Sequence, residues 1–505
     1  MNTGTRATTW PEQAARSLSG ERLTALAGAL GLLLLGAAIA WLPLQLAVAA
    51  VAGGIGLLTL LVHPLWGLYA LVFAIPFGVL RGVSLGGLTI GAVEALTAAI
   101  IACWLARQIA RREIRLHWPP LTIPLLILLG AMAFSLTIAA SLTQSLIELA
   151  KWVEVLALYV LIANGIRPKA ALGLVLCLLL AGSAEALLGL YQFVFRVGPE
   201  GFLLMGRFMR AYGTFQQPNP YAGYLGLQLP LACGLLAVEG RGLWEGWRQR
   251  HGLRRLVSWV ALGSLALMAL ALAASWSRGG WLGFAVAVAA MAVALSRRTL
   301  AAAAAVAAAL VIFAAMGGLA LLPPALVQRV TDTLPYAAGL DIRAVEVDDA
   351  NWALVERMAH WQAAWEMFAA HPWRGVGIGN YAVAYPAYAL PRWQDPLGHA
   401  HNYYLNILAE TGLVGLAAFA IFWLAALAQA IRALRRCRGY ARGLALAALG
   451  MLAHLTVHNA FDNLFVQGMY LQLAFVLGAL HALTRLGPQS TALSAAPGGP
   501  ACASD

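Results

Sequence analysis

Residues 301–322 read AAAAAVAAALVIFAAMGGLALL, an apolar run without a single charged residue. A helix needs about 20 such residues to cross the hydrocarbon core of a bilayer. Similar runs recur from Leu23 to Leu486, and the 505-residue chain is 61% hydrophobic and only 11% charged. A soluble domain carries about 25% charged residues. The sequence therefore predicts an all-α, polytopic bundle of transmembrane helices and excludes a soluble enzyme and an outer-membrane barrel.

The apolar runs predict fourteen spans, at 24–42, 43–62, 66–81, 86–106, 119–138, 143–163, 170–195, 219–238, 255–275, 279–297, 300–322, 410–432, 442–460 and 464–484. Two of them, 43–62 and 66–81, are short and interrupted by Pro64, Pro76 and Gly78. If these two are re-entrant or fused, the bundle has twelve spans.

The net charge of +12 comes almost entirely from arginine, because Lys151 and Lys169 are the only lysines among 33 basic residues. The arginines cluster in short loops at 107–115, 241–255 and 432–442. This is the positive-inside pattern of membrane proteins, so the orientation of the chain in the membrane, and not nucleic-acid binding, explains the positive charge. The five cysteines offer no pair for an external disulfide.

Orientation divides the chain into five parts. Residues 1–22 contain Glu12 and Glu21, unlike a signal peptide, and are predicted to be cytoplasmic. Residues 23–322 and 410–486 are the transmembrane parts. Between them, 323–409 is the one long polar segment. Counting the predicted spans from a cytoplasmic N-terminus places it outside, as a periplasmic or extracellular helical loop domain. Residues 487–505, rich in Ser, Ala, Gly and Pro, are predicted to be a disordered cytoplasmic tail.

Within the loop domain, residues 350–370 predict an amphipathic helix with three tryptophans at the membrane interface. A glycine-rich turn, 375–380, follows it. This turn is not a dinucleotide fingerprint, because Asn380 stands where the third glycine is required and no strand precedes it.

Two segments that are predicted to lie outside contain arginines, contrary to the positive-inside pattern. Residues 207–219 contain Arg207 and Arg210 before a predicted helix start at which Asn219 is a candidate N-cap. Residues 275–281 place Arg278 in a tight turn between two spans. Guanidinium groups match phosphate oxygens bidentately and stay charged at neutral pH, so such arginines at one membrane face can grip a diphosphate.

Histidines mark two further segments, one with Arg357 and His360 and one with His399, His401 and Asn402. Histidine can accept a proton near pH 7, which makes these residues candidates for a general base. The alternative for His399 and His401 is a metal site, but no carboxylate besides Asp395 lies near them in sequence. His454, His458 and Asp462 follow helical spacing and form either a ligand set or proton path, or a hydrogen-bonded interhelical cluster.

Charged residues also occur inside the apolar runs. Glu148, Lys151 and Glu154 recur at helical spacing within one span and can neutralise one another, whereas Glu94 and Glu185 have no partner nearby in sequence. These charged residues either pair with one another inside the bundle or form a path for ions, and the sequence leaves both interpretations open.

At these motifs the chain resembles the O-antigen ligase family of bacterial polytopic enzymes. The resemblance rests on His401-Asn402 followed after nine residues by Gly412-x-x-Gly415, on Arg210 with Gly213-Thr214-Phe215 and Pro218-Asn219, on Ser277-Arg278-Gly279, and on Arg357 with Trp361 before Gly375-x-Gly377. Their order and the large external loop also agree, from about residue 200 to 465.

The resemblance implies an inverting, metal-independent glycosyltransferase of the bacterial inner membrane. It would move O-antigen polysaccharide from undecaprenyl diphosphate to lipid A-core on the periplasmic face, without a cofactor. His401 would be the catalytic base, and Arg210 and Arg278 would bind the donor diphosphate. Supporting roles would fall to the residues around them, namely Arg207, Asn219, Arg357, His399 and Asn402.

Three alternatives remain open at this point. The same superfamily pattern covers O-antigen polymerases and protein O-oligosaccharyltransferases, which differ from ligases in the acceptor. A secondary transporter is the alternative from another class, and it would use the intramembrane carboxylates. The absence of paired broken helices in two matching halves argues against the transporter.

Overall fold

A computed structural model describes residues 43–78, 82–85, 88–112, 117–240, 252–321, 346–347 and 351–485, together with isolated positions at 26, 29–31, 33–34, 36–37, 324 and 327. The predicted amino-terminal segment, the carboxy-terminal tail, most of the 24–42 run and the start of the loop domain lie outside these residues. The chain forms two compact units, 1–66 and 67–505. In the first, the main described element is helix α2, Leu44–Val62.

Helix α3, Pro64–Phe77, begins at the end of the first unit and continues into the second. The second unit contains the further helices α4 Ala92–Ala110, α5 Thr122–Ser135, α6 Leu142–Gly165, α7 Pro168–Phe195, α8 Pro218–Glu239, α10 Gly252–Ala274, α11 Arg278–Leu295, α12 Arg297–Ala315, α14 Trp352–Ala370, α15 Tyr381–Ala384, α16 Tyr403–Arg436, α17 Gly439–His458 and α18 Leu471–Arg485. Two small antiparallel hairpins accompany them. One pairs β1 Gly82–Leu85 with β2 Leu88–Gly91, and the other pairs β3 Leu203–Leu204 with β4 Phe208–Met209.

Eight helices in the described part of the chain are long and apolar enough to cross a membrane, namely α4, α7, α8, α10, α11, α12, α16 and α17. Shorter apolar helices lie at Leu46–Val62, Pro64–Phe77, Thr122–Ile138 and Leu471–Arg485. The all-α, polytopic membrane class is therefore confirmed, while the count of twelve to fourteen spans stays a prediction.

One predicted boundary is wrong, and another falls at a break in the structure. The run predicted as a span at 86–106 contains strand β2 near its start, and its helix starts only at Ala92. The span predicted from 410 begins beside Gly412, where α16 leaves the helical conformation. The first part of α16 starts earlier, at Tyr403, where the Asn402 side chain caps it by accepting hydrogen bonds from the backbone N–H of Tyr404 and Leu405 at 3.0 and 3.1 Å.

The core of the bundle is the crossing of α8 and α17. Gly234 and Gly443 face each other there so closely that a Cβ on Gly234 would lie 2.3 Å from the Gly443 carbonyl oxygen. Small residues let membrane helices approach at backbone distance. By contrast, α12 has no buried residue, so its alanine-rich surface faces outward.

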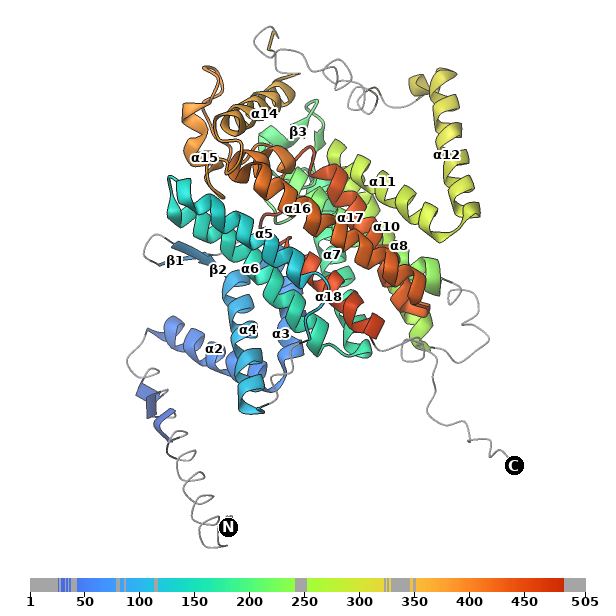
Figure 1. Cartoon of the computed structure of the whole chain (residues 1–505). Helices are drawn as coiled ribbons and strands as arrows, with labels where there is room; N and C mark the ends of the chain where they lie inside the picture. The colour runs from blue at the N-terminus through green and yellow to red at the C-terminus, as the bar shows by residue number, and fades with distance from the viewer. Residues whose placement is uncertain are drawn as a thin grey trace, which may run out of the picture. The chain divides into compact units, whose positions relative to one another are not determined.

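Helix ends that carry the candidate motifs gather at one end of this bundle. The start of α8, the end of α10, the start of α11 and the end of α17 meet there, as the hydrogen bond from Ala211 N–H to the Ala274 carbonyl (3.0 Å) illustrates. The opposite end holds the Arg254–Glu239 ion pair (2.7 Å). Helix α14 and the β3–β4 hairpin lie at the motif end (Figure 1).

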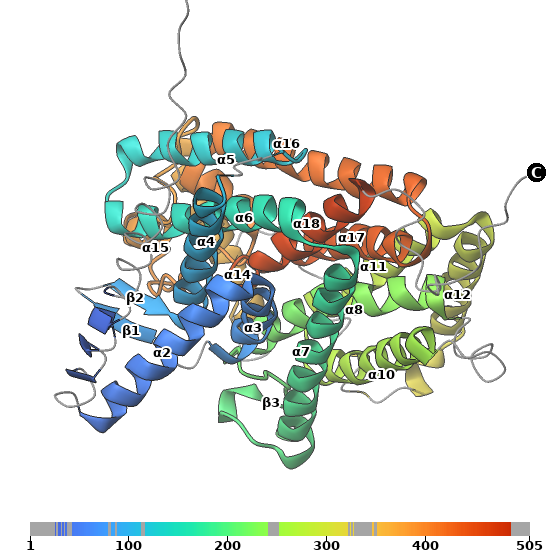
Figure 2. The same ribbon diagram turned by 90° about the horizontal axis from the view of Figure 1, so that it is seen from below.

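The glycine-rich turn holds a kink in α16. Gly412 leaves the helical conformation with φ 63° and ψ −163°. The carbonyl groups of Ala409 and Glu410 instead accept hydrogen bonds from Val376 and Gly377, both at 2.9 Å. A Cβ on Gly375 would lie 2.2 Å from the Glu410 carbonyl carbon, so glycine is required at this backbone crossing. Helix α16 then runs beside α5, as Figure 2 also shows.

Candidate active site

Arg210 is held by the polar atoms around it. It follows β4, and its Nε donates to the Ser275 carbonyl at 2.9 Å while an Nη donates to Asn219 Oδ1 at 3.1 Å. Asn219 is the second residue of α8, whose N-cap is Gln217. The prediction that Asn219 caps the helix is therefore wrong, because its side chain is turned to Arg210.

Two buried side chains of α7 fix the loop after Arg210. Gln192 Oε1 accepts from the backbone N–H of Gly213 at 2.8 Å, and Glu185 accepts from the Thr214 hydroxyl at 2.7 Å. Gly213 has φ 56°, and a Cβ there would lie 2.1 Å from Glu185 Oε2. Glu185, which has no partner nearby in sequence, is thus a structural anchor for the Gly213-Thr214-Phe215 motif.

Arg278 is the first residue of α11, and Ser277 caps that helix by accepting a hydrogen bond from Gly280 N–H at 3.4 Å. A cation at a helix amino terminus opposes the helix dipole and costs stability, so an anionic partner would offset that cost. Arg278 lines a small cavity of about 20 Å³ together with Asn219, Arg357 and Phe461. The cavity is about the size of one water, so a diphosphate can enter only if these side chains move.

Arg357 comes from α14 and brings a second guanidinium to this cavity. Burial lowers its pKa, the charge of Arg278 lowers it further, and the carboxylate of Asp462 opposes both. Asn219 touches Arg210 and lines the cavity with Arg278 and Arg357. Three arginines from distant parts of the chain therefore converge here.

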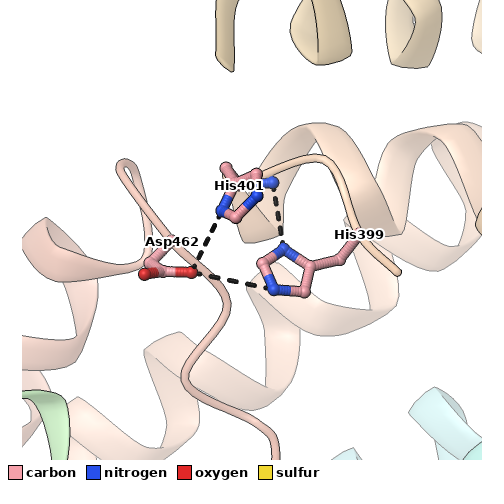
Figure 3. A group of neighbouring side chains, drawn as sticks. All are labelled: His399, His401 and Asp462. Atoms are coloured by element: carbon pink, nitrogen blue, oxygen red, sulfur yellow. Dashed lines mark hydrogen bonds and ion pairs between the residues drawn. The ribbon is translucent and has the colours of Figure 1, made fainter. Parts of the chain in front are cut away.

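His401, His399 and Asp462 form a cluster beside these arginines (Figure 3). His401 Nδ1 lies 3.5 Å from Asp462 Oδ1, and His399 Nε2 lies 3.8 Å from the same oxygen. The backbone N–H of His401 donates to His399 Nδ1 at 3.1 Å. His401 itself has φ 50°, a left-handed conformation that costs a non-glycine residue about 1–3 kcal/mol and is typical of functional sites.

The electrostatics of the cluster keep Asp462 ionised and His399 neutral. Burial alone would raise the pKa of Asp462, but its contact with His401 and the nearby charges of His399 and Arg357 lower it below the ordinary value of 3.8. Burial lowers the pKa of His399 to about 4, against the opposing effect of Asp462. His360, stacked on Tyr385 behind His401, also has its pKa lowered to about 4 by burial.

The ligand atoms of His399, His401 and Asp462 lie within 4.8 Å of one another, so their spacing alone would allow a metal ion. The hydrogen bond to His399 Nδ1 argues otherwise. Because that nitrogen accepts a hydrogen bond from the His401 backbone N–H, the neutral ring carries its own hydrogen on Nε2, the atom that faces Asp462. A histidine that ligates a metal usually donates its other ring N–H instead. The tautomer assigned from this contact therefore suits a hydrogen-bonded cluster better than a metal site.

Two sequence interpretations change here. Helix α17 ends at His458, so Asp462 lies beyond it and turns to His399 and His401; the predicted His454–His458–Asp462 stripe on one helical face is wrong. Asp462 is the carboxylate that lies beside His399 and His401 in the structure, although it is distant from them in sequence. Its position came from a chain reversal after α17, which no local spacing reveals.

Arg207 stands apart from the cluster. It is exposed in the turn between β3 and β4, and its guanidinium lies 5.4 Å from the centre of the adjacent Phe208 ring. Asn402, by contrast, acts locally as the N-cap of α16 and so fixes the chain direction immediately after His401.

Comparison with known proteins supports the resemblance drawn from these motifs. The family described as O-Antigen ligase matches residues 263–420, which include Arg278, Arg357, His399, His401 and Asn402. None of the curated proteins compared with the chain matches it significantly. The family match confirms the resemblance over this part of the chain and supports a glycosyltransferase-like activity on polysaccharide or lipid-linked substrates in a membrane.

Proposed function

We propose that this protein is an O-antigen ligase of the bacterial inner membrane. It transfers O-antigen polysaccharide from undecaprenyl diphosphate to lipid A-core, with its active site facing the periplasm and both termini in the cytoplasm. The observation that carries the proposal is the convergence of Arg210, Arg278 and Arg357 beside the His401–Asp462 pair.

The reaction is a single displacement. The acceptor hydroxyl oxygen attacks the anomeric carbon of the donor sugar, and the bond from that carbon to the diphosphate oxygen breaks. The configuration inverts, and undecaprenyl diphosphate leaves. No carboxylate is placed by the matched motifs as a nucleophile for a retaining double displacement.

His401 receives the hydroxyl proton. With Nδ1 directed at Asp462 and carrying a hydrogen, Nε2 is the nitrogen with a lone pair for the proton. The ionised Asp462 orients the ring and stabilises the imidazolium that forms. The 3.5 Å separation is longer than an ordinary hydrogen bond, and such contacts often tighten when substrate is bound.

The arginines stabilise the leaving group. Charge develops on the diphosphate as the glycosidic bond breaks, and fixed guanidinium groups stabilise that charge without a cofactor or a divalent cation. Arg210 and Arg278 are proposed to bind the diphosphate, Arg357 and Asn219 to support them, and His399 to hold the His401 backbone.

The proposal is tested by deleting the gene in its natural host. The expected result is lipopolysaccharide that lacks O-antigen while long, lipid-linked polymer accumulates. Loss of the polymer itself would instead identify an O-antigen polymerase, and loss of glycan from proteins would identify a protein O-oligosaccharyltransferase. Unchanged glycans together with altered solute uptake would favour the secondary transporter.

The transporter has less support from the described residues. Glu185 binds Thr214, Glu148 pairs with Lys151, and Glu154 accepts a hydrogen bond from the Tyr470 hydroxyl at 3.0 Å. These contacts account for four of the five intramembrane charges, all except Glu94, as parts of the packing.

A further inference from the structure

A second cavity, of about 420 Å³, is lined by His399 of the histidine cluster. Its walls come from α6, from the chain around Gly379 and α15, and from the first turns of α16. Gly379 lets the glycine-rich turn lie directly on α6, since a Cβ there would lie 2.6 Å from the Gln144 carbonyl oxygen. The cavity has the size of a small-ligand site.

The Asp462 segment separates this cavity from the arginine-lined one. Phe461 lines the small cavity and Asn463 lines the large one, with Asp462 between them in the chain. His399 also lines the large cavity. Asn406, another lining residue, accepts a hydrogen bond from Ala400 N–H at 3.0 Å and so holds the loop that carries both histidines.

The two cavities differ in charge. The small one is lined by Arg278 and Arg357 and by no carboxylate. The large one is lined by Glu148 and Glu410 with a single cation, Lys151, which forms an ion pair with Glu148. An anionic diphosphate is attracted to the first cavity, whereas the only cation that lines the second is already paired with Glu148.

We propose that the large cavity binds the accepting sugar, and that this sugar is rich in hydroxyl groups and bears no phosphate. The assignment rests on the proposed function, because it takes His401 as the base. It places the donor diphosphate and the acceptor sugar on the two sides of the segment from Phe461 to Asn463. His399, which lines the large cavity and is hydrogen-bonded to the His401 backbone, connects the acceptor side to the base.

The polar groups that line the cavity suit hydroxyl groups. Carboxylates accept hydrogen bonds from sugar hydroxyls, and the amide groups of Asn406 and Asn463 can donate to sugar oxygens. Lys151 is already neutralised by Glu148, so it leaves no net positive charge for a phosphate.

Filling the cavity tests the assignment. Ala382 and Val383 line it, whereas Ala387 is exposed on the following turn and does not. In reconstituted transfer, Ala382→Phe and Val383→Phe should raise the acceptor KM about tenfold or more, with kcat and the donor KM nearly unchanged, because they remove binding that is common to ground and transition states. Ala387→Phe is the matched control and should behave as wild type.

Acceptor binding without donor gives an independent readout. A soluble neutral oligosaccharide from the acceptor should raise the melting temperature of the wild-type protein but not of Ala382→Phe or Val383→Phe. The same oligosaccharide with a phosphate on its terminal sugar should give no such shift.

The outcomes separate the two proposals. If wild-type protein transfers glycan but both cavity variants match Ala387→Phe, or raise the donor KM instead, the acceptor assignment is wrong and the ligase proposal stands. If the neutral oligosaccharide binds in the cavity and no transfer occurs, the assignment of a sugar site survives and the proposed function fails. Tighter binding of the phosphorylated oligosaccharide would overturn the charge argument.

Discussion

The two cavities that flank Asp462 form an instructive pair. One is about 20 Å³ and is lined by arginines, and the other is about 420 Å³ and is lined by carboxylates, amides and one paired lysine. Phe461 and Asn463, two residues apart, face different cavities. A transferase must keep an anionic donor and a hydroxyl acceptor apart until one group joins them. In the proposed assignment, the difference in charge keeps donor and acceptor apart, and His401 is the general base.

The largest expected effect comes from removing the proposed general base. His401→Ala should leave a folded, membrane-inserted protein whose transfer rate is lower by about 10²–10⁴, the usual contribution of a general base. Single-turnover transfer by the purified variant measures the effect. Near-normal transfer would show that His401 is not the base.

Arg278→Lys and Arg210→Lys test the arginine-lined side. Each should raise the donor KM by about ten- to a hundredfold, since lysine offers a point charge in place of a guanidinium fork and a hydrogen bond to a charged group is worth about 1.5–3 kcal/mol. Arg297→Lys is the control, because Arg297 is exposed at the start of α12, beyond the opposite end of α11. The proposal that Arg210 and Arg278 bind the donor diphosphate is wrong if all three variants use the donor equally well.

His399 should act through the position of His401. His399→Leu removes the acceptor of the His401 backbone N–H and should lower kcat about tenfold, since a buried donor left unpaired costs about 1–3 kcal/mol. His399→Asn puts an oxygen near the place of Nδ1 and should restore most of the rate. If asparagine and leucine were equally harmful, the hydrogen bond would not be the reason for the loss.

The smallest expected effect concerns stability. His399 has a pKa of about 4 in the folded protein against about 6.5 when unfolded, so between these values the unfolded state binds more protons. The contribution of His399 to stability should therefore be lost as pH falls from 6.5 towards 4. Asp462 adds no slope in that window, because its pKa is lowered from 3.8.

Melting temperatures of wild type and His399→Asn across this range measure that slope. The melting temperature of wild type relative to that of the variant should fall as pH falls, because only wild type loses the contribution of His399. Parallel curves for the two proteins would contradict the assignment of the slope to His399.

Sequence patterns predicted the helices well, because each apolar run must satisfy its backbone hydrogen bonds within itself in a bilayer. They also brought Arg210, Arg278, Arg357 and His401 forward as candidates, through residue chemistry and through the resemblance to a family. They failed where the chain reverses. Asp462 follows a helix whose end at His458 has no strong local signal, and the β1–β2 hairpin lies inside an apolar stretch that reads as a helix.

The glycine-rich turn shows the same limit of sequence analysis. A run such as Gly375-x-Gly377-x-Gly379 predicts a turn, and the structure contains one. Only the fold reveals that Gly375 crosses the backbone of α16 and Gly379 that of α6, because both contacts join segments distant in sequence. The cavity beside Gly379 was likewise invisible in the sequence.

If this chain transfers a glycan from a polyprenyl diphosphate by arginine and histidine chemistry, the reaction needs no divalent cation. The most direct test uses purified protein, undecaprenyl-diphosphate-linked glycan and lipid A-core, with and without EDTA. Transfer should proceed at the same rate in both conditions and should be almost absent with His401→Ala. Transfer that stops in EDTA and returns with one specific metal would contradict this expectation, and would make His399, His401 and Asp462 the ligands of that ion.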